Sequence, residues 1–299
     1  MAITINTNVS SMVVQSNLAK STKQLNQAIE RMTTGYKINK AADNAAGYSI
    51  ARNWETQLGS LDIAADNAAT GADMLSTLED HYSLISSHVQ RVRDLTEQAA
   101  NGTYGTQSKL AIQSEINARL EEIDRIAANC EFSGQYMMNG SLKAGLAIQV
   151  GTDGNAAKSQ IALAGDLFKR ADIKALFEGD NANNVTDAAK KTSRDAVAKK
   201  CADLDNGTSA SGMLAKIDEV INTISSRITT LGAAQNRIES AIESIGVQSE
   251  NITSSLSTLR DADVATESSN YIKAQILQQA SATLLATANQ SPSIALNLL

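Results

Sequence analysis

Residues 214–259 read LAKIDEVINTISSRITTLGAAQNRIESAIESIGVQSENITSSLSTL, and this stretch decides the fold because an apolar residue recurs at every seventh position. The repeat consists of Ile217, Ile224, Leu231, Ile238, Ile245, Ile252 and Leu259. A second apolar set fills the companion position of the heptad and is interrupted by Gln235 and Ser249, which weaken the seam but help to fix its register. The pattern predicts one helix of roughly 65 Å at 1.5 Å per residue.

The partners of this helix are expected in the first half of the chain. An alternation of three- and four-residue steps, typical of a coiled-coil seam, runs through Leu75, Leu78, Tyr82, Ile85, Val89 and Val92. After a turn-rich stretch at 101–105, a shorter helix carries the same rhythm through Ile116, Leu120, Ile123 and Ala127. The two helices therefore fold back on one another and offer matching stripes to the 214–259 helix.

Each end of the chain carries a further amphipathic helix. The first is marked by Val14, Leu18, Leu25, Ile29 and Met32 and should stop near Gly35; the last is marked by Ile272, Ile276, Leu277, Ala280, Leu284 and Leu285. The chain finishes on the apolar residues Leu296, Leu298 and Leu299. Neither helix has much to pack on within one copy, so we expect both to become ordered when neighbouring copies arrive. The small, polar segment 39–47 predicts a joint and a domain boundary.

The middle of the chain has a different texture. Asn139-Gly140 is a turn signal, and Leu146, Ile148 and Val150 alternate with other residues, which predicts a small β-hairpin at about 132–150. Residues 151–210 lack sustained periodicity and predict a small, exposed, variable insert that is α+β or irregular. The fold class is therefore mainly α: a long antiparallel helical bundle or coiled coil formed by the N- and C-terminal segments.

Composition excludes several function classes. The net charge is -6, with 26 basic against 32 acidic residues, so nucleic acid is not an expected partner. No apolar run approaches the length of about 18 residues that a membrane helix needs, and the N-terminus lacks a secretory signal. Two cysteines, Cys130 and Cys201, are too few for a structural zinc site. A disulfide between them and two buried free thiols are both open, and we favour the thiols.

No catalytic signature is present, so we expect neither an enzyme nor a cofactor nor a metal site. The HExxH motif, nucleophile motifs and phosphate-binding loops are missing from the sequence. His81 and His88 lie seven residues apart, and we interpret them as polar neighbours of the seam instead of metal ligands. Asp43, Asp261 and Asp263 could suggest an acidic site, but capping and joint roles account for them better.

The two ends of the chain resemble bacterial flagellin, the subunit of the flagellar filament. At the front the resemblance lies in residues 5–8 (INTN), 28–35 (AIERMTTG), 38–39 (IN) and 42–47 (ADNAAG). At the back it lies in residues 231–238 (LGAAQNRI), 261–267 (DADVATE), 273–280 (KAQILQQA) and 288–290 (ANQ). The resemblance is specific at both ends and covers about four fifths of the length.

The resemblance implies a subunit that polymerises with itself into a helical filament for swimming motility. Residues 1–44 with 256–299 would form paired inner-tube helices, residues 45–150 with 211–255 the outer tube, and residues 151–210 a small surface domain. It also implies an extracellular location, reached through the flagellum's own type III apparatus without a cleaved signal peptide. An export chaperone, a filament cap and hook-filament junction proteins are implied partners. A hook-filament junction adaptor, which shares such ends, is the alternative function.

Two groups of site residues follow. The residues expected to pack in the seams or between subunits are Leu18, Leu25, Met32, Leu75, Tyr82, Val89, Ile217, Ile224, Leu231, Ile238, Ile245, Ile252, Leu259, Leu284, Leu298 and Leu299. Flagellins are also sensed by an animal Toll-like receptor, and Arg91, Leu95 and Glu115 stand at the family's contact positions. A host receptor is therefore a further implied partner if this bacterium meets an animal.

Overall fold

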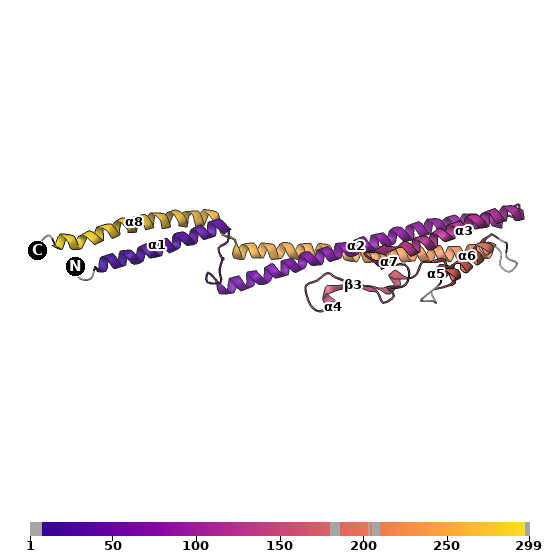
Figure 1. Ribbon diagram of the computed structural model, residues 1–299, viewed down its shortest axis with the longest axis horizontal. Coiled ribbons are helices and arrows are strands. Elements are labelled where there is room, and N and C mark those ends of the chain that lie inside the picture. Colours follow the sequence, from indigo (N-terminus) through magenta and orange to yellow (C-terminus); the bar gives the residue numbers. More distant parts are fainter. Residues whose placement is uncertain (1–7, 180–185, 203, 205–209, 297–299) are drawn as a thin grey trace. The chain divides into compact units, whose positions relative to one another are not determined.

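The computed structural model describes residues 8–179, 186–202, 204 and 210–296 (Figure 1). The chain divides into two compact units: residues 1–59 with 249–299, and residues 60–248. Most of it is helical, in agreement with the predicted fold class. Within the described residues, no helix combines the length and the apolar character needed to cross a membrane.

The first unit is built on two antiparallel helices, α1 (Val9–Thr34) and α8 (Val264–Leu296). They lie side by side, in indigo and yellow in Figure 1. The Asn8 side chain caps the start of α1 by accepting a hydrogen bond from the backbone N–H of Ser11 at 3.0 Å. Gly35 ends α1 as predicted, with a φ of 76° that favours glycine.

The second unit is a bundle of α2 (Ala45–Ala100), α3 (Thr106–Asn129) and α7 (Ala210–Arg260), of which α2 and α7 each extend into the first unit. The prediction of one long helix with a buried seam is confirmed by α7, which runs for 51 residues. The seam residues that are at most 1% exposed are Leu75, Tyr82, Val89, Ile217, Ile224, Leu231 and Ile238. The core of the bundle therefore joins residues from both halves of the sequence.

The strand pairing differs from the predicted hairpin at 132–150. A tight hairpin joins β1 (Glu131–Phe132) to β2 (Gln135–Tyr136), and β3 (Leu146–Gln149) pairs antiparallel with β4 (Gln160–Leu163). Ser133 and Gly134, both with positive φ, make the first turn. The turn at Asn139-Gly140 instead follows Met137 and Met138, which are buried in the core and do not continue a strand.

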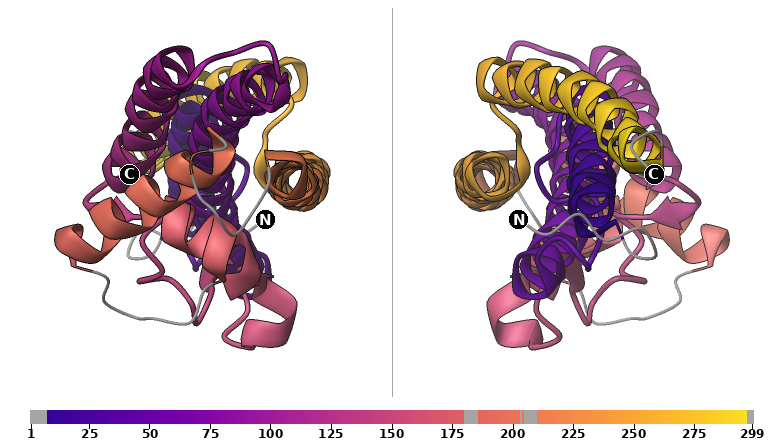
Figure 2. Two further views of the ribbon diagram at one scale, coloured as in Figure 1. Left: turned by 90° about the vertical axis from the view of Figure 1, so that its right-hand side faces the viewer. Right: turned by 90° about the vertical axis from the view of Figure 1, so that its left-hand side faces the viewer.

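The insert shares the core of the second unit. It comprises α4 (Ala156–Ser159), β4, the 3-10 helix η1 (Gly165–Phe168), α5 (Ile173–Glu178) and α6 (Asp187–Cys201). Phe168 and Ile173 are fully buried in the core that α2, α3 and α7 form. Asp124 of α3 fastens the insert by accepting hydrogen bonds from Ile173 N at 2.9 Å and from Arg194 at 2.7 Å. Figure 2 shows the insert helices, in salmon and orange, against the bundle.

Candidate assembly interface

A line of small residues is buried on each helix of the α1–α8 pair. Ser21 and Ala28 on α1 lie seven residues apart, as do Ala274 and Ser281 on α8, and all four are buried. Short side chains allow two helix backbones to approach closely. The predicted seam residues Leu18 and Leu25 are half-buried beside this line. The four small residues could not be predicted from the sequence, because Ser and Ala give no strong apolar signal.

A series of polar contacts fixes the antiparallel register of this helix pair. The contacts join Asn8 Nδ2 to Ala288 O (2.8 Å), Ser11 Oγ to Asn289 Oδ1 (2.8 Å), Gln278 Nε2 to Thr22 Oγ1 (3.1 Å) and Arg31 Nη1 to Glu267 Oε1 (3.0 Å). Glu267 is only 8% exposed, so its ion pair with Arg31 is partly shielded from water. The series spans nearly the whole length of α1 and excludes a slip of one helix along the other.

The faces of α1 and α8 that point away from each other carry large apolar side chains. Those that are at least 37% exposed are Val9, Met12, Val13, Ile29 and Met32 on α1, and Val264, Ile272, Ile276, Leu277 and Leu284 on α8. Of the predicted packing residues, Met32 and Leu284 thus face outward, and Leu298 and Leu299 lie outside the described residues. A helix with apolar residues all round is ordinarily a buried helix. The outward faces of α1 and α8 are therefore more apolar than is usual for a surface that stays in contact with water.

The chain segments that follow α1 and precede α8 are clamped together. Lys37 donates its backbone N–H to Arg260 O at 2.7 Å, and Ala262 donates to Gly35 O at 2.8 Å. Arg260 lies over the Tyr36 ring, 4.0 Å from its centroid, and pairs with Glu55. This clamp joins residues more than 200 positions apart, and no local sequence pattern indicated it.

The aspartates near the clamp have the predicted capping and joint roles: Asp263 caps the start of α8, and Asp43 and Asp261 accept hydrogen bonds within the joint. Asp43 accepts hydrogen bonds from the backbone N–H groups of Lys40 and Asn39, and the Lys40 bond in particular lowers the pKa of Asp43. Asp263 accepts from the Thr266 hydroxyl and from Ala265 N, and the Thr266 bond lowers the pKa of Asp263. Asp261 accepts from the Ser257 hydroxyl at 2.6 Å. These contacts explain all three carboxylates without an acidic binding site.

The seam of the second unit contains polar contacts that specify its pairing. Gln235, which interrupts the companion stripe, donates to Glu79 of α2 at 2.9 Å. Tyr82 is buried, which raises the pKa of its phenol, and Arg227 of α7 donates to its hydroxyl at 3.3 Å. Towards the C-terminal end of α7, Ile245 is 5% exposed, whereas Ile252 and Leu259 are half-buried. The predicted role of Gln235 in setting the register fits its bond to Glu79.

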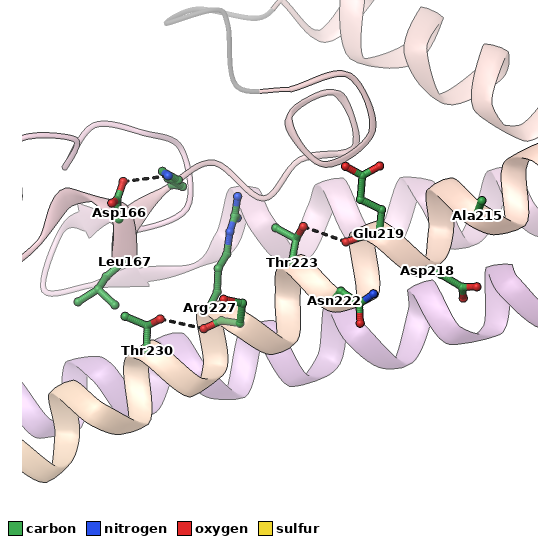
Figure 3. A pocket seen from close by; sticks show the side chains of 11 residues that line it. Asp166, Leu167, Ala215, Asp218, Glu219, Asn222, Thr223, Arg227 and Thr230 are labelled. Carbon is green, nitrogen blue, oxygen red and sulfur yellow. Dashed lines mark hydrogen bonds and ion pairs between the residues drawn. The ribbon is translucent and has the colours of Figure 1, made fainter.

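A groove with a volume of about 870 Å³ lies between η1 and α7 (Figure 3). Three of its charged groups have partners: Lys169 pairs with Asp166 at 2.8 Å, and Asp218 pairs with Arg93 at 2.7 Å. The hydroxyls of Thr223 and Thr230 donate to carbonyl oxygens of their own helix. These two hydroxyls are hydrogen-bonded to the backbone and not to a side chain that could act as a base.

The cysteines and His81, which could in principle act as nucleophiles or metal ligands, lie in surroundings that favour neither role. Cys130 and Cys201 are free and buried, and burial raises the pKa of Cys130 to about 12 and that of Cys201 to about 11. Both therefore stay neutral thiols, which are poor nucleophiles and poor metal ligands. His81 Nδ1 lies 2.8 Å from Thr77 O on its own helix. The described ranges contain no group of three or more His, Cys, Asp or Glu side chains that could hold a metal ion.

The predicted receptor-contact residues divide into two kinds. Arg91 of α2 and Glu115 of α3 form an ion pair at 2.9 Å, with side chains 48% and 40% exposed. Leu95 is only 2% exposed and packs in the core beneath them. A partner approaching this face would therefore meet Arg91 and Glu115 but not the Leu95 side chain.

Comparisons with known proteins agree along the whole chain. The family model described as the bacterial flagellin N-terminal helical region matches residues 5–143, and the model of the C-terminal helical region matches residues 214–299. The flagellin of Bacillus subtilis (strain 168) is 32% identical over 307 residues, and the flagellar filament 33 kDa core protein of Treponema phagedenis is 30% identical over 295 residues. Both alignments cover 99% of this chain and 99% of the relative. The crystal structure of Bacillus cereus flagellin aligns with a TM-score of 0.43 and 22% identity, covering 60% of this chain and 88% of that one.

Proposed function

The chain belongs to the bacterial flagellin family and is a structural subunit of the flagellar filament, and on that premise we propose that α1 and α8 form its main self-associating layer. In this proposal residues 1–44 with 256–299 form the inner tube and residues 45–150 with 211–255 form the outer tube. Residues 151–210 are the surface part of the outer layer. The filament is then a helical homopolymer held from the inside by the terminal helices.

The observation that carries this proposal is the outward apolar surface of the α1–α8 pair. Ile272, Ile276 and Leu284 are each more than half exposed, although they lie on a helix that already has a partner. Covering one such side chain completely contributes about 1.5–3 kcal/mol. Several such side chains on each copy supply a large driving force for association. In the single copy they remain exposed to water.

The remaining partners follow from the family. We propose that the chain is exported through the flagellum's own type III apparatus without a cleaved signal peptide. An export chaperone, which would cover the apolar terminal segments before assembly, is a partner in this scheme, as are the filament cap and the hook-filament junction proteins. Propagation is favoured over the adaptor alternative because filament subunits match the chain over 99% of its length. The Thr223 hydroxyl is hydrogen-bonded within its own helix, and the Cys130 thiol is neutral; both observations support a structural role and not an enzymatic one.

A second proposal concerns the exposed ion pair of Arg91 and Glu115. These residues stand at the family's Toll-like receptor positions, and both side chains are accessible. The ion pair orients the guanidinium and leaves donors free for a second acceptor on a partner. We limit the receptor surface to this pair and its exposed neighbours, with Leu95 supporting the helix from below.

Seeded assembly of the purified chain tests the proposed self-association. Ile276→Asp places a charge on the exposed face of α8, so the single copy keeps its fold while elongation from filament seeds is lost. The matched variant Ile276→Leu keeps an apolar side chain at the same position and should elongate at close to the wild-type rate. Electron microscopy and sedimentation measure the outcome. Normal filaments from Ile276→Asp would show that this face of α8 does not form part of the interface between copies.

A further inference from the structure

The outer face of α2 in the second unit is acidic, and no other described segment of the chain covers it. Asp62, Asp66, Asp73 and Asp80 are exposed and fall within about 40° of arc, at 100° per residue. Buried residues such as Leu75 and Tyr82 lie on the opposite face of the helix. No Lys or Arg occurs between Arg52 and Arg91. Among the described residues, none of the four aspartate side chains takes part in a hydrogen bond or an ion pair.

Apolar residues flank this acidic face. Ile63 is 60% exposed and Leu84 is 52% exposed, and neither is covered by another part of the described chain. Protein surfaces that join partners commonly combine exposed apolar groups with charges that guide the approach. The face therefore has the mixed character of a contact surface.

A complementary surface lies on α6 of the same unit. Lys191 and Lys199 are exposed and lie eight residues apart on its outer side, with Lys190 and Lys200 next to them. Arg194, on the inner side, is already bound to Asp124. Asp195 lies between the two exposed lysines. We call this surface, from Lys190 to Lys200, the basic ridge.

We propose that the acidic face of α2 docks against the basic ridge of a second copy of this chain. The inference rests on the proposed self-association and specifies one of its contacts. Lys191 and Lys199 are about 12 Å apart along α6, and Asp66 and Asp73 about 10.5 Å apart along α2, so long lysine side chains reach both carboxylates. Asp195 then faces the interval around Ala69 and Thr70, where α2 carries no charge.

This contact is heterologous because the two surfaces are different parts of one copy. A copy that offers its acidic face to one neighbour still presents its basic ridge to another neighbour. Such a contact cannot close as a two-fold dimer and instead propagates into a ring or a filament. The proposed contact therefore matches the propagating assembly of a filament subunit, and its strength falls as salt screens the charges.

Charge reversal on each surface separately, followed by mixing, tests the contact. The first variant is Asp66→Lys with Asp73→Lys, and the second is Lys191→Asp with Lys199→Asp. Each variant alone brings like charges together, so elongation from seeds at low salt should be at least about tenfold slower than for the wild type. In an equimolar mixture the reversed face of one variant meets the reversed ridge of the other, and elongation should recover.

A matched control is Glu239→Lys with Glu243→Lys, which makes the same charge change at two exposed sites on α7 and should elongate normally. Thermal unfolding followed by circular dichroism establishes that every variant is folded. The wild-type chain in the same assay tests self-association itself, so the two proposals fail separately. Normal elongation of either charge-reversed variant alone would assign the acidic face to a different basic partner and overturn the proposal. Failure of the mixture of folded variants would overturn it as well.

Discussion

Ile238 illustrates at the scale of single residues what each position of the seven-residue repeat contributes. Its side chain is fully buried between α7 and the facing helices, in a core that also contains Leu75 and Tyr82. Ile, Ser, Thr and Asn are only middling helix formers, so α7 depends on this burial more than on its intrinsic propensity. The stability of the second unit therefore depends on the buried apolar positions of this seam.

The change Ile238→Asp should destabilise the second unit by about 3 kcal/mol or more, because the new carboxylate is buried without a partner. Urea unfolding of the single copy measures this cost, and filament formation and swimming should fail with it. The neighbouring change Arg237→Asp introduces the same group at an exposed position and should cost less than about 0.5 kcal/mol. Equal stability of the two variants would contradict the buried seam.

The two thiols give a second prediction at this scale. Burial raises the pKa of Cys130 to about 12 and that of Cys201 to about 11, from an ordinary value of 9.0. Iodoacetamide at pH 8 should therefore label neither thiol in the native chain and both thiols in urea. Their contribution to stability is complete below pH 9 and is lost as the pH rises from 9 to 12, because the unfolded chain ionises first. An intact mass lacking two hydrogens would show a disulfide and sink this account.

Patterns in the sequence predicted some of these residues and could not predict others. The repeat from Ile217 to Leu259 needs no structure to be recognised, since its period alone specifies a helix seam. The small residues Ala28 and Ala274 are buried because two distant helices lie together, and no local pattern marks them. The clamp made by Arg260 depends equally on residues brought together by the fold.

At the scale of elements, the sequence predicts the helices better than it predicts the pairing of the strands. The long helices were predictable because periodicity over many turns outweighs local exceptions. The strands were not, because four residues such as Leu146–Gln149 carry too little alternation to identify their partner. The insert also appeared irregular in sequence, although Phe168 and Ile173 complete the core of the bundle. The pairing of β3 with β4 ties this insert to the segment before it.

Gly145 is the element-scale test of that pairing. Its φ is 84°, and a Cβ atom there would lie 2.3 Å from the carbonyl oxygen of Leu163 on β4. Gly145→Ala should therefore destabilise the second unit by about 1–3 kcal/mol, from backbone strain and a clash with a rigid backbone atom. Gly154→Ala is the control, since no atom lies within 4 Å of its Cβ position. Matching urea midpoints for both variants would argue against the β3–β4 arrangement.

At the scale of the whole molecule, the two units differ in how much of their apolar surface is buried within one copy. The second unit has a continuous apolar core and holds its own stability. The first unit has a seam of small residues, a series of polar contacts and a large outward apolar surface that the described part of the chain leaves uncovered. Membership of the flagellin family explains this difference between the units, since a filament subunit must exist as a single copy before assembly and be held firmly in the polymer afterwards.

Hydrogen exchange of the backbone amides, compared between the single copy and the assembled filament, tests this claim most directly. The account predicts that amides of α1 and α8 exchange rapidly in the single copy and become protected by at least about a hundredfold in the filament. Amides around Leu75 and Ile238 should be protected in both states. Equal protection of α1 and α8 before and after assembly would contradict the claim that the terminal helices are completed by neighbouring copies.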